Sequence, residues 1–74
     1  MVIQESEFEH PVRGGRIRID VFEDGGGYLV TEARDGVRTV VATLGAFDSR
    51  DQALARAEGR AAQLLGQRYR KVSV

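Results

Sequence analysis

The spacing of the apolar residues changes once along this chain of 74 residues, near Phe47. Before Phe47, apolar and polar residues alternate, as in the segment 16–21, where Ile17, Ile19 and Val21 share one face. After Phe47, apolar residues recur at steps of three and four, which is typical of an amphipathic helix. The length suits one domain, so we expect residues 1–74 to fold around a single small core.

The first half of the chain predicts strands over residues 3–8, 16–21, 28–34 and 37–44. Asp35-Gly36 is a hairpin signal, and a two-residue turn there pairs Arg34 with Val37. This register predicts a core face with the residues Leu29, Val40, Ala42 and Leu44. It predicts an opposite face with the residues Tyr28, Val30, Glu32, Thr39, Val41 and Thr43.

The second half predicts a helix over residues 49–66, with a capping box from Ser49 to Gln52 and with Gly66 just beyond the last turn. The expected inward stripe consists of Leu54, Ala57, Ala61, Leu64 and Leu65, and the expected outward residues are Arg56, Arg60 and Gln63. A last strand follows over residues 69–74. We therefore expect an α+β fold in the order β-β-β-β-α-β, with a single antiparallel-rich sheet and one helix packed on one face.

The composition excludes several kinds of site. The chain has no cysteine, so it has no disulfide, thiolate nucleophile or cysteine-based metal site, and it suits a reducing compartment. Its one histidine, His10, lies beside Pro11 and is interpreted as a surface turn residue rather than a general base. We expect no catalytic residue, no cofactor and no bound metal. The protein is predicted not to be an enzyme.

No targeting or membrane segment is expected, because the first residues lack the pattern of a signal peptide and the apolar runs are short. The run Asp24-Gly25-Gly26-Gly27 lacks the Lys-Ser/Thr of a phosphate-binding loop and is interpreted as a hairpin turn. These patterns indicate a cytoplasmic protein that does not contact membranes.

Charge is balanced overall but unevenly distributed, with a formal net charge of +0. Glu5, Glu7 and Glu9 recur at period two, either as a site for a cation or basic partner or as a solvated edge strand. The opposite end of the chain carries the basic cluster of Arg56, Arg60, Arg68, Arg70 and Lys71. This cluster either binds nucleic acid or neutralises the glutamates within the fold.

A single helix covers only one side of a sheet, which leaves the other side open. We expect the open face to display the residues Arg18, Phe22, Tyr28, Val30 and Val41. A mixture of apolar groups with a charged margin is typical of an interface. A second strip of small residues, formed by Gly59 with Ala55 and Ala62, either admits another backbone or is simply tolerated.

Residues 16–74 resemble the HicB-like antitoxin family. The similarity is carried by Gly26-Gly27-Tyr28-Leu29-Val30 and by the segment 45–57, GAFDSRDQALARA. The resemblance implies a partial RNase H-type fold and a non-catalytic, often oligomeric domain that blocks a partner ribonuclease. The family's proline-rich segment after the second strand is absent. The segment before the helix is also similar to the three-stranded arm-binding domains of integrases, which place a sheet in DNA.

These observations favour a small non-catalytic protein-interaction domain that binds itself, as a homodimer, or an antitoxin-like partner through the open face. The alternative is a nucleic-acid-binding adaptor that uses the basic cluster.

Overall fold

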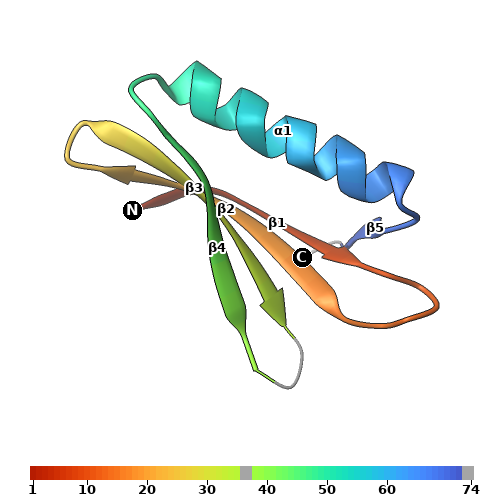
Figure 1. Cartoon of the computed structure of the whole chain (residues 1–74). Coiled ribbons are helices and arrows are strands. Elements are labelled where there is room, and N and C mark those ends of the chain that lie inside the picture. Colours follow the sequence, from red (N-terminus) through yellow and green to blue (C-terminus); the bar gives the residue numbers. More distant parts are fainter. Residues whose placement is uncertain (36–37, 73–74) are drawn as a thin grey trace.

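The computed structural model describes residues 1–35 and 38–72 and has one five-stranded antiparallel sheet with one helix packed against it (Figure 1). The elements in chain order are β1 Val2–Glu9, β2 Arg16–Asp24, β3 Gly27–Asp35, β4 Val40–Phe47, α1 Arg50–Gly66 and β5 Arg70–Val72. Across the sheet the order is β4-β3-β2-β1-β5. The predicted α+β class and the β-β-β-β-α-β order are confirmed.

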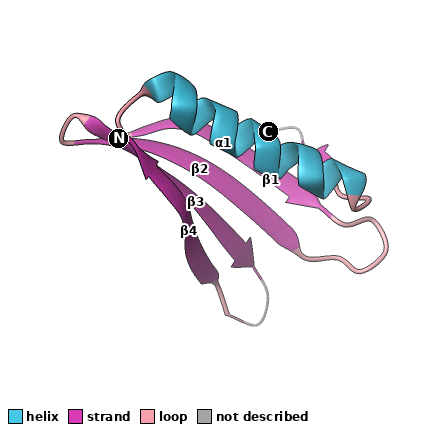
Figure 2. Cartoon of the chain, turned by 45° about the horizontal axis from the view of Figure 1, so that its top comes forward, coloured by secondary structure: helices cyan, strands magenta, loops and turns pink. Residues whose placement is uncertain are grey.

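Helix α1 follows the edge strand β4, crosses one face of the sheet and leads to β5 at the opposite edge (Figure 2). It begins as predicted, because the Ser49 side chain accepts a hydrogen bond from the backbone N–H of Gln52 at 3.3 Å. In the described residues, no helix has the length and apolar character needed to cross a membrane.

The end of α1 differs from the prediction. Gly66 lies within the helix, and the left-handed residue after it is Arg68, with φ 73°. The backbone N–H of Tyr69 donates to the Leu64 carbonyl at 3.0 Å, and that of Arg68 donates to Leu65 at 3.3 Å. These two bonds form a Schellman motif, which satisfies the last carbonyls of the helix. The motif therefore has an arginine where glycine is usual.

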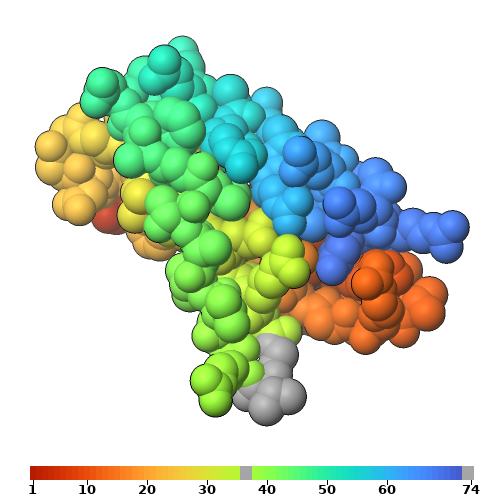
Figure 3. All heavy atoms as spheres, in the orientation of Figure 1, coloured from red at the N-terminus to blue at the C-terminus, as the bar shows by residue number. Residues whose placement is uncertain are grey.

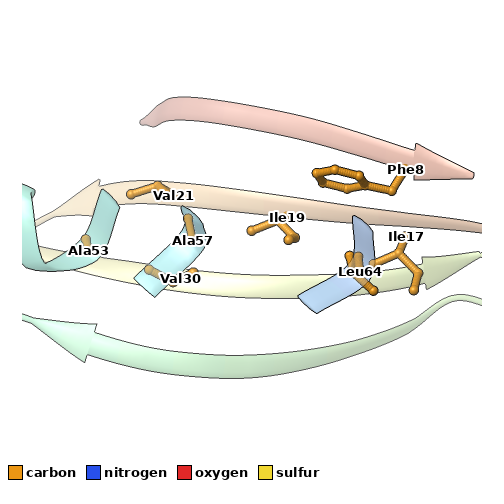
Figure 4. Packing of buried hydrophobic residues seen from close by; sticks show 8 residues of the cluster. All are labelled: Phe8, Ile17, Ile19, Val21, Val30, Ala53, Ala57 and Leu64. Carbon is orange, nitrogen blue, oxygen red and sulfur yellow. The ribbon is translucent and has the colours of Figure 1, made fainter. Parts of the chain in front are cut away.

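The core lies between α1 and the sheet (Figure 4). It consists of Phe8, Ile17, Ile19, Val21, Val30, Ala53, Ala57 and Leu64. The two alanines let the helix approach β2 and β3 closely, and each larger apolar side chain contributes about 1.5–3 kcal/mol by its burial. Ala57 and Leu64 were predicted correctly, whereas Leu65 is 53% exposed and Ala53, which was not predicted, is fully buried.

The predicted register of β3 and β4 is wrong. Arg34 pairs with Val40 rather than Val37, and a bulge follows opposite Val30 and Thr31. Gly36 and Val37, on which the predicted turn depends, lie outside the described residues. Successive side chains of a strand point to opposite faces of the sheet. A register shift of three positions therefore exchanges the residues of β4 that share a face with a given residue of β3. Val30 is therefore fully buried beneath α1, and Leu29 lies on the opposite face.

Candidate interaction surface

The sheet face opposite α1, here called the open face, has no covering element in the parts of the chain that the structure describes. Directly paired residues in antiparallel strands share a face, so the register defines what this face displays. One end is apolar and the other end is charged, with Asp20 and Thr31 between them.

The apolar end is a row that crosses four strands. Cross-strand pairing places Val2 beside Phe22, Phe22 beside Leu29, and Leu29 beside Ala46. Val2 is 45% exposed, while Phe22 and Leu29 are partly buried by their neighbours. This apolar row forms a contiguous hydrophobic surface, which isolated surface residues do not.

The charged end is a row of alternating sign, formed in order across the sheet by Arg70, Glu9, Arg16 and Asp35. Arg16 contacts Glu7 at 3.4 Å and Glu9 at 3.7 Å, and Arg70 donates to Glu9 at 3.0 Å. These pairs are solvated and each contributes at most about 1 kcal/mol. Part of the N-terminal negative charge is thus neutralised within the fold, through Arg70 and Arg16.

Between the two ends, Arg18 donates through Nε to Oδ2 of Asp20 at 2.9 Å. This hydrogen bond raises the pKa of Arg18 above its ordinary value. The Asp20 side chain is only 6% exposed, and its other oxygen, Oδ1, has no hydrogen-bond partner within the described residues. A buried carboxylate oxygen that accepts no hydrogen bond destabilises the fold. The centre of the open face therefore has a buried acceptor, Oδ1 of Asp20, that a hydrogen-bond donor would stabilise.

Three of the five residues predicted for this face lie on it, namely Arg18, Phe22 and Val41. The predicted placement of Tyr28 and Val30 is wrong, because both lie on the side of α1 and pack with the core. Sequence reasoning did not assign Val2, Leu29 or Ala46 to this face. Their shared row depends on the register of all four strands.

The basic cluster is divided among different parts of the fold. Arg56 and Arg60 do not face outward as predicted: Arg56 donates to the Leu44 carbonyl at 3.4 Å, and Arg60 binds Glu32. Arg68 lies in the Schellman motif, while Arg70 and Lys71 follow on β5. Arg70 shares the open face with Glu9, whereas Lys71, one residue further, points to the other side.

A buried ion pair joins α1 to β3. The Glu32 carboxylate accepts from Nε and Nη2 of Arg60 and, at 3.0 Å, from Nε of Arg34. The side chains of Glu32 and Arg60 are 6% and 14% exposed. Burial tends to raise the pKa of Glu32, but the two arginines outweigh it and the pKa is lowered. The same hydrogen bond raises the pKa of Arg60.

His10 is buried, so its predicted place as a surface residue is wrong. Its Nδ1 accepts from the backbone N–H groups of Val12 at 3.2 Å and Arg13 at 3.1 Å. Its ring also meets Tyr69 edge-on, with centroids 5.2 Å apart. His10 therefore shapes the turn after β1 and ties it to the segment after α1.

Two hollows lie at the ends of the molecule. One, of about 460 Å³, is bordered by residues that include Asp24, Tyr28, Phe47 and Gln52, and the other, of about 440 Å³, lies beside His10 and Gln67. Within residues 1–35 and 38–72, no three His, Asp or Glu side chains are grouped to hold a metal ion. The first hollow also borders Leu29 and Ala46 at one end of the apolar row, whereas the second does not reach that row.

In comparisons with known proteins, no family model matches the chain, and no curated protein or solved structure is significantly similar to it.

Proposed function

We propose that this chain is a small non-catalytic protein-interaction domain that associates with itself through the open face of its sheet. The observation that carries the proposal is the apolar row of Val2, Phe22, Leu29 and Ala46, which crosses four strands on the face that α1 does not cover. The polar residues Asp20 and Thr31 lie next to this row on the same face, as polar groups border the apolar part of an interface.

The side chains that could perform acid or base chemistry support a structural role. Glu7, Glu9, Asp20 and Glu32 each contact at least one arginine, and these contacts are distributed over both faces of the sheet. Catalytic carboxylates instead converge on one cavity. The antitoxin-like partner implied by the family resemblance stays a prediction, and it would use the same open face.

Light scattering tests the proposal. The wild-type chain should have the mass of an oligomer, and Phe22→Ser should reduce that mass by half while the far-ultraviolet circular dichroism stays unchanged. Val12→Ser is the matched control, because Val12 is 85% exposed in the turn after β1. An unchanged mass for Phe22→Ser would contradict the proposal.

The same measurement with a mixed pool of short RNA and DNA tests the alternative. A monomer that gains mass only with nucleic acid at low salt would favour the basic cluster, since phosphate binding weakens steeply with salt. Lys71→Glu should then reduce the gain and make the dependence on salt less steep. Binding that is absent or independent of salt would reject a nucleic-acid adaptor.

A further inference from the structure

The two edges of the sheet differ in their capacity to pair with another strand. At one edge, β5 has three residues in the part of the chain that the structure describes, and it carries Arg70 and Lys71; shortness and charge both protect an edge. At the other edge, β4 has eight residues without a charged side chain, and Val40 and Val41 are 55% and 62% exposed. In Figure 3, β4 is the green segment along the border of the molecule. This strand is not protected by shortness or by charged side chains.

Among residues 1–35 and 38–72, only the first half of β4 has an outer edge without a pairing partner. The bulge between β3 and β4 interrupts the strand near Leu44, and Arg56 donates to the Leu44 carbonyl. A bulge and an occupied carbonyl both prevent regular pairing beyond that point. The free edge is therefore Val40–Thr43, where alternate residues direct their N–H and C=O groups outward.

We infer that this edge, Val40–Thr43, pairs antiparallel with the same segment of a second copy, which would form a continuous ten-stranded sheet. Pairing of β4 with β5 of another copy would create an open fibre, and the charges and shortness of β5 disfavour it. Pairing of β4 with itself closes after two copies. With a formal net charge of +0, two copies do not repel each other strongly.

The two-fold axis then passes near Val41 and Ala42. Side chains on the same face must meet across an antiparallel pair, so Val41 lies near its counterpart on the open side. On the side of α1, Val40 of each copy lies opposite Ala42 of the other copy. The apolar rows of the two copies consequently lie on the same side of the continuous sheet. The edge contact is therefore distinct from the face-to-face contact of the proposed function. This inference rests on that proposed function, because it adds a second contact to the same self-associating chain.

Two variants separate these contacts. Val40→Lys places a charge at the edge on the side of α1, and Phe22→Ser affects the open face alone. With both contacts present, light scattering should give four chains for the wild type, two for each single variant and one for the double variant. Val12→Lys is the control for the added charge and should retain four chains.

The outcomes are distinguishable. If Val40→Lys keeps the wild-type mass, the edge pairing is refuted and the face contact stands. If Phe22→Ser keeps the wild-type mass, the face contact is refuted instead. A wild-type monomer refutes both, and fibres in place of closed oligomers refute the two-fold pairing.

Cross-linking gives an independent readout that does not depend on destabilising the contact. The natural chain has no cysteine, so single cysteines can be placed at Ala42 or at Phe22. A short bismaleimide should link Ala42→Cys chains efficiently if the edges pair. In an edge-paired dimer the two copies of position 22 are at least five strand spacings apart, which is roughly 24 Å across the sheet alone. Linking of Phe22→Cys without linking of Ala42→Cys would overturn the inference.

Discussion

Arg60 on α1 and Glu32 on β3 are 28 positions apart in the chain and form a buried ion pair that fixes the helix on the sheet. Arg34 approaches the same carboxylate from β3 itself. The helix is thus oriented by a directional contact, in addition to the non-directional burial of its alanines and Leu64.

Removing one partner of this pair should destabilise the fold. We expect Arg60→Met to reduce the free energy of unfolding by about 3 kcal/mol, the lower end of the range for a buried pair, because Arg34 still donates to Glu32. Urea denaturation measures the change. Arg50→Met, at the exposed start of α1, is the matched control and should change little.

The lowered pKa of Glu32 predicts how stability depends on pH. Because the folded state binds this proton less tightly than the unfolded state, the contribution is complete above the unfolded pKa of about 4.3. It is lost as the pH falls through the lower pKa of the folded state. Urea denaturation from about pH 6 to about pH 3 should show this decline. Glu32→Gln should show a shallower one, and equal slopes would assign the decline to other carboxylates.

The left-handed conformation of Arg68 predicts a stabilising substitution. Glycine adopts this conformation without the steric cost of a Cβ atom, so Arg68→Gly should raise the free energy of unfolding by about 1 kcal/mol. Thermal denaturation provides the measurement. Arg68→Ala removes the same charge but keeps the Cβ atom, and a similar gain for it would show that charge rather than backbone strain is responsible.

Gly59 predicts a second stabilising change, because a Cβ atom at this helical position would meet no atom within 4 Å. We expect Gly59→Ala to stabilise the fold by about 1 kcal/mol. Gly45→Ala is the contrasting variant, since its Cβ would lie 2.7 Å from the Phe47 ring and displace a residue that packs against the core. If Gly59→Ala destabilises the protein instead, the small-residue strip is in contact with another chain.

Local signals predicted the elements of this fold well. The alternation of Ile17, Ile19 and Val21 predicted β2 and its buried face, and Ser49 predicted the start of α1. These properties depend on residues close together in the chain. The predicted register of β3 and β4 was wrong because Asp35-Gly36 is typical of a two-residue turn. The observed pairing of Arg34 with Val40 requires a longer connection between the strands.

That error spread to the candidate site. Once Val30 and Glu32 were assigned to the open face, nothing in the sequence indicated that Arg60 had a buried partner, and an arginine on a helix was expected to face solvent. The Schellman motif was missed for a related reason, since Gly66 was the obvious residue for it and Arg68 was not. Such contacts depend on the pairing of distant strands and on the packing of the helix against the sheet. Neither can be inferred from the local pattern of a single sequence.

The pairing of β5 with β1 has a consequence for synthesis of the chain. Strands β1 to β3 are joined by short turns and can pair as they leave the ribosome, whereas Phe8 and Ile17 stay uncovered until Leu64 emerges. The ion pair of Glu9 with Arg70 also forms late in synthesis, because Arg70 lies 61 positions further along the chain. A nascent chain arrested before α1 therefore displays its apolar sheet face, and exposed hydrophobic surface of this kind favours aggregation.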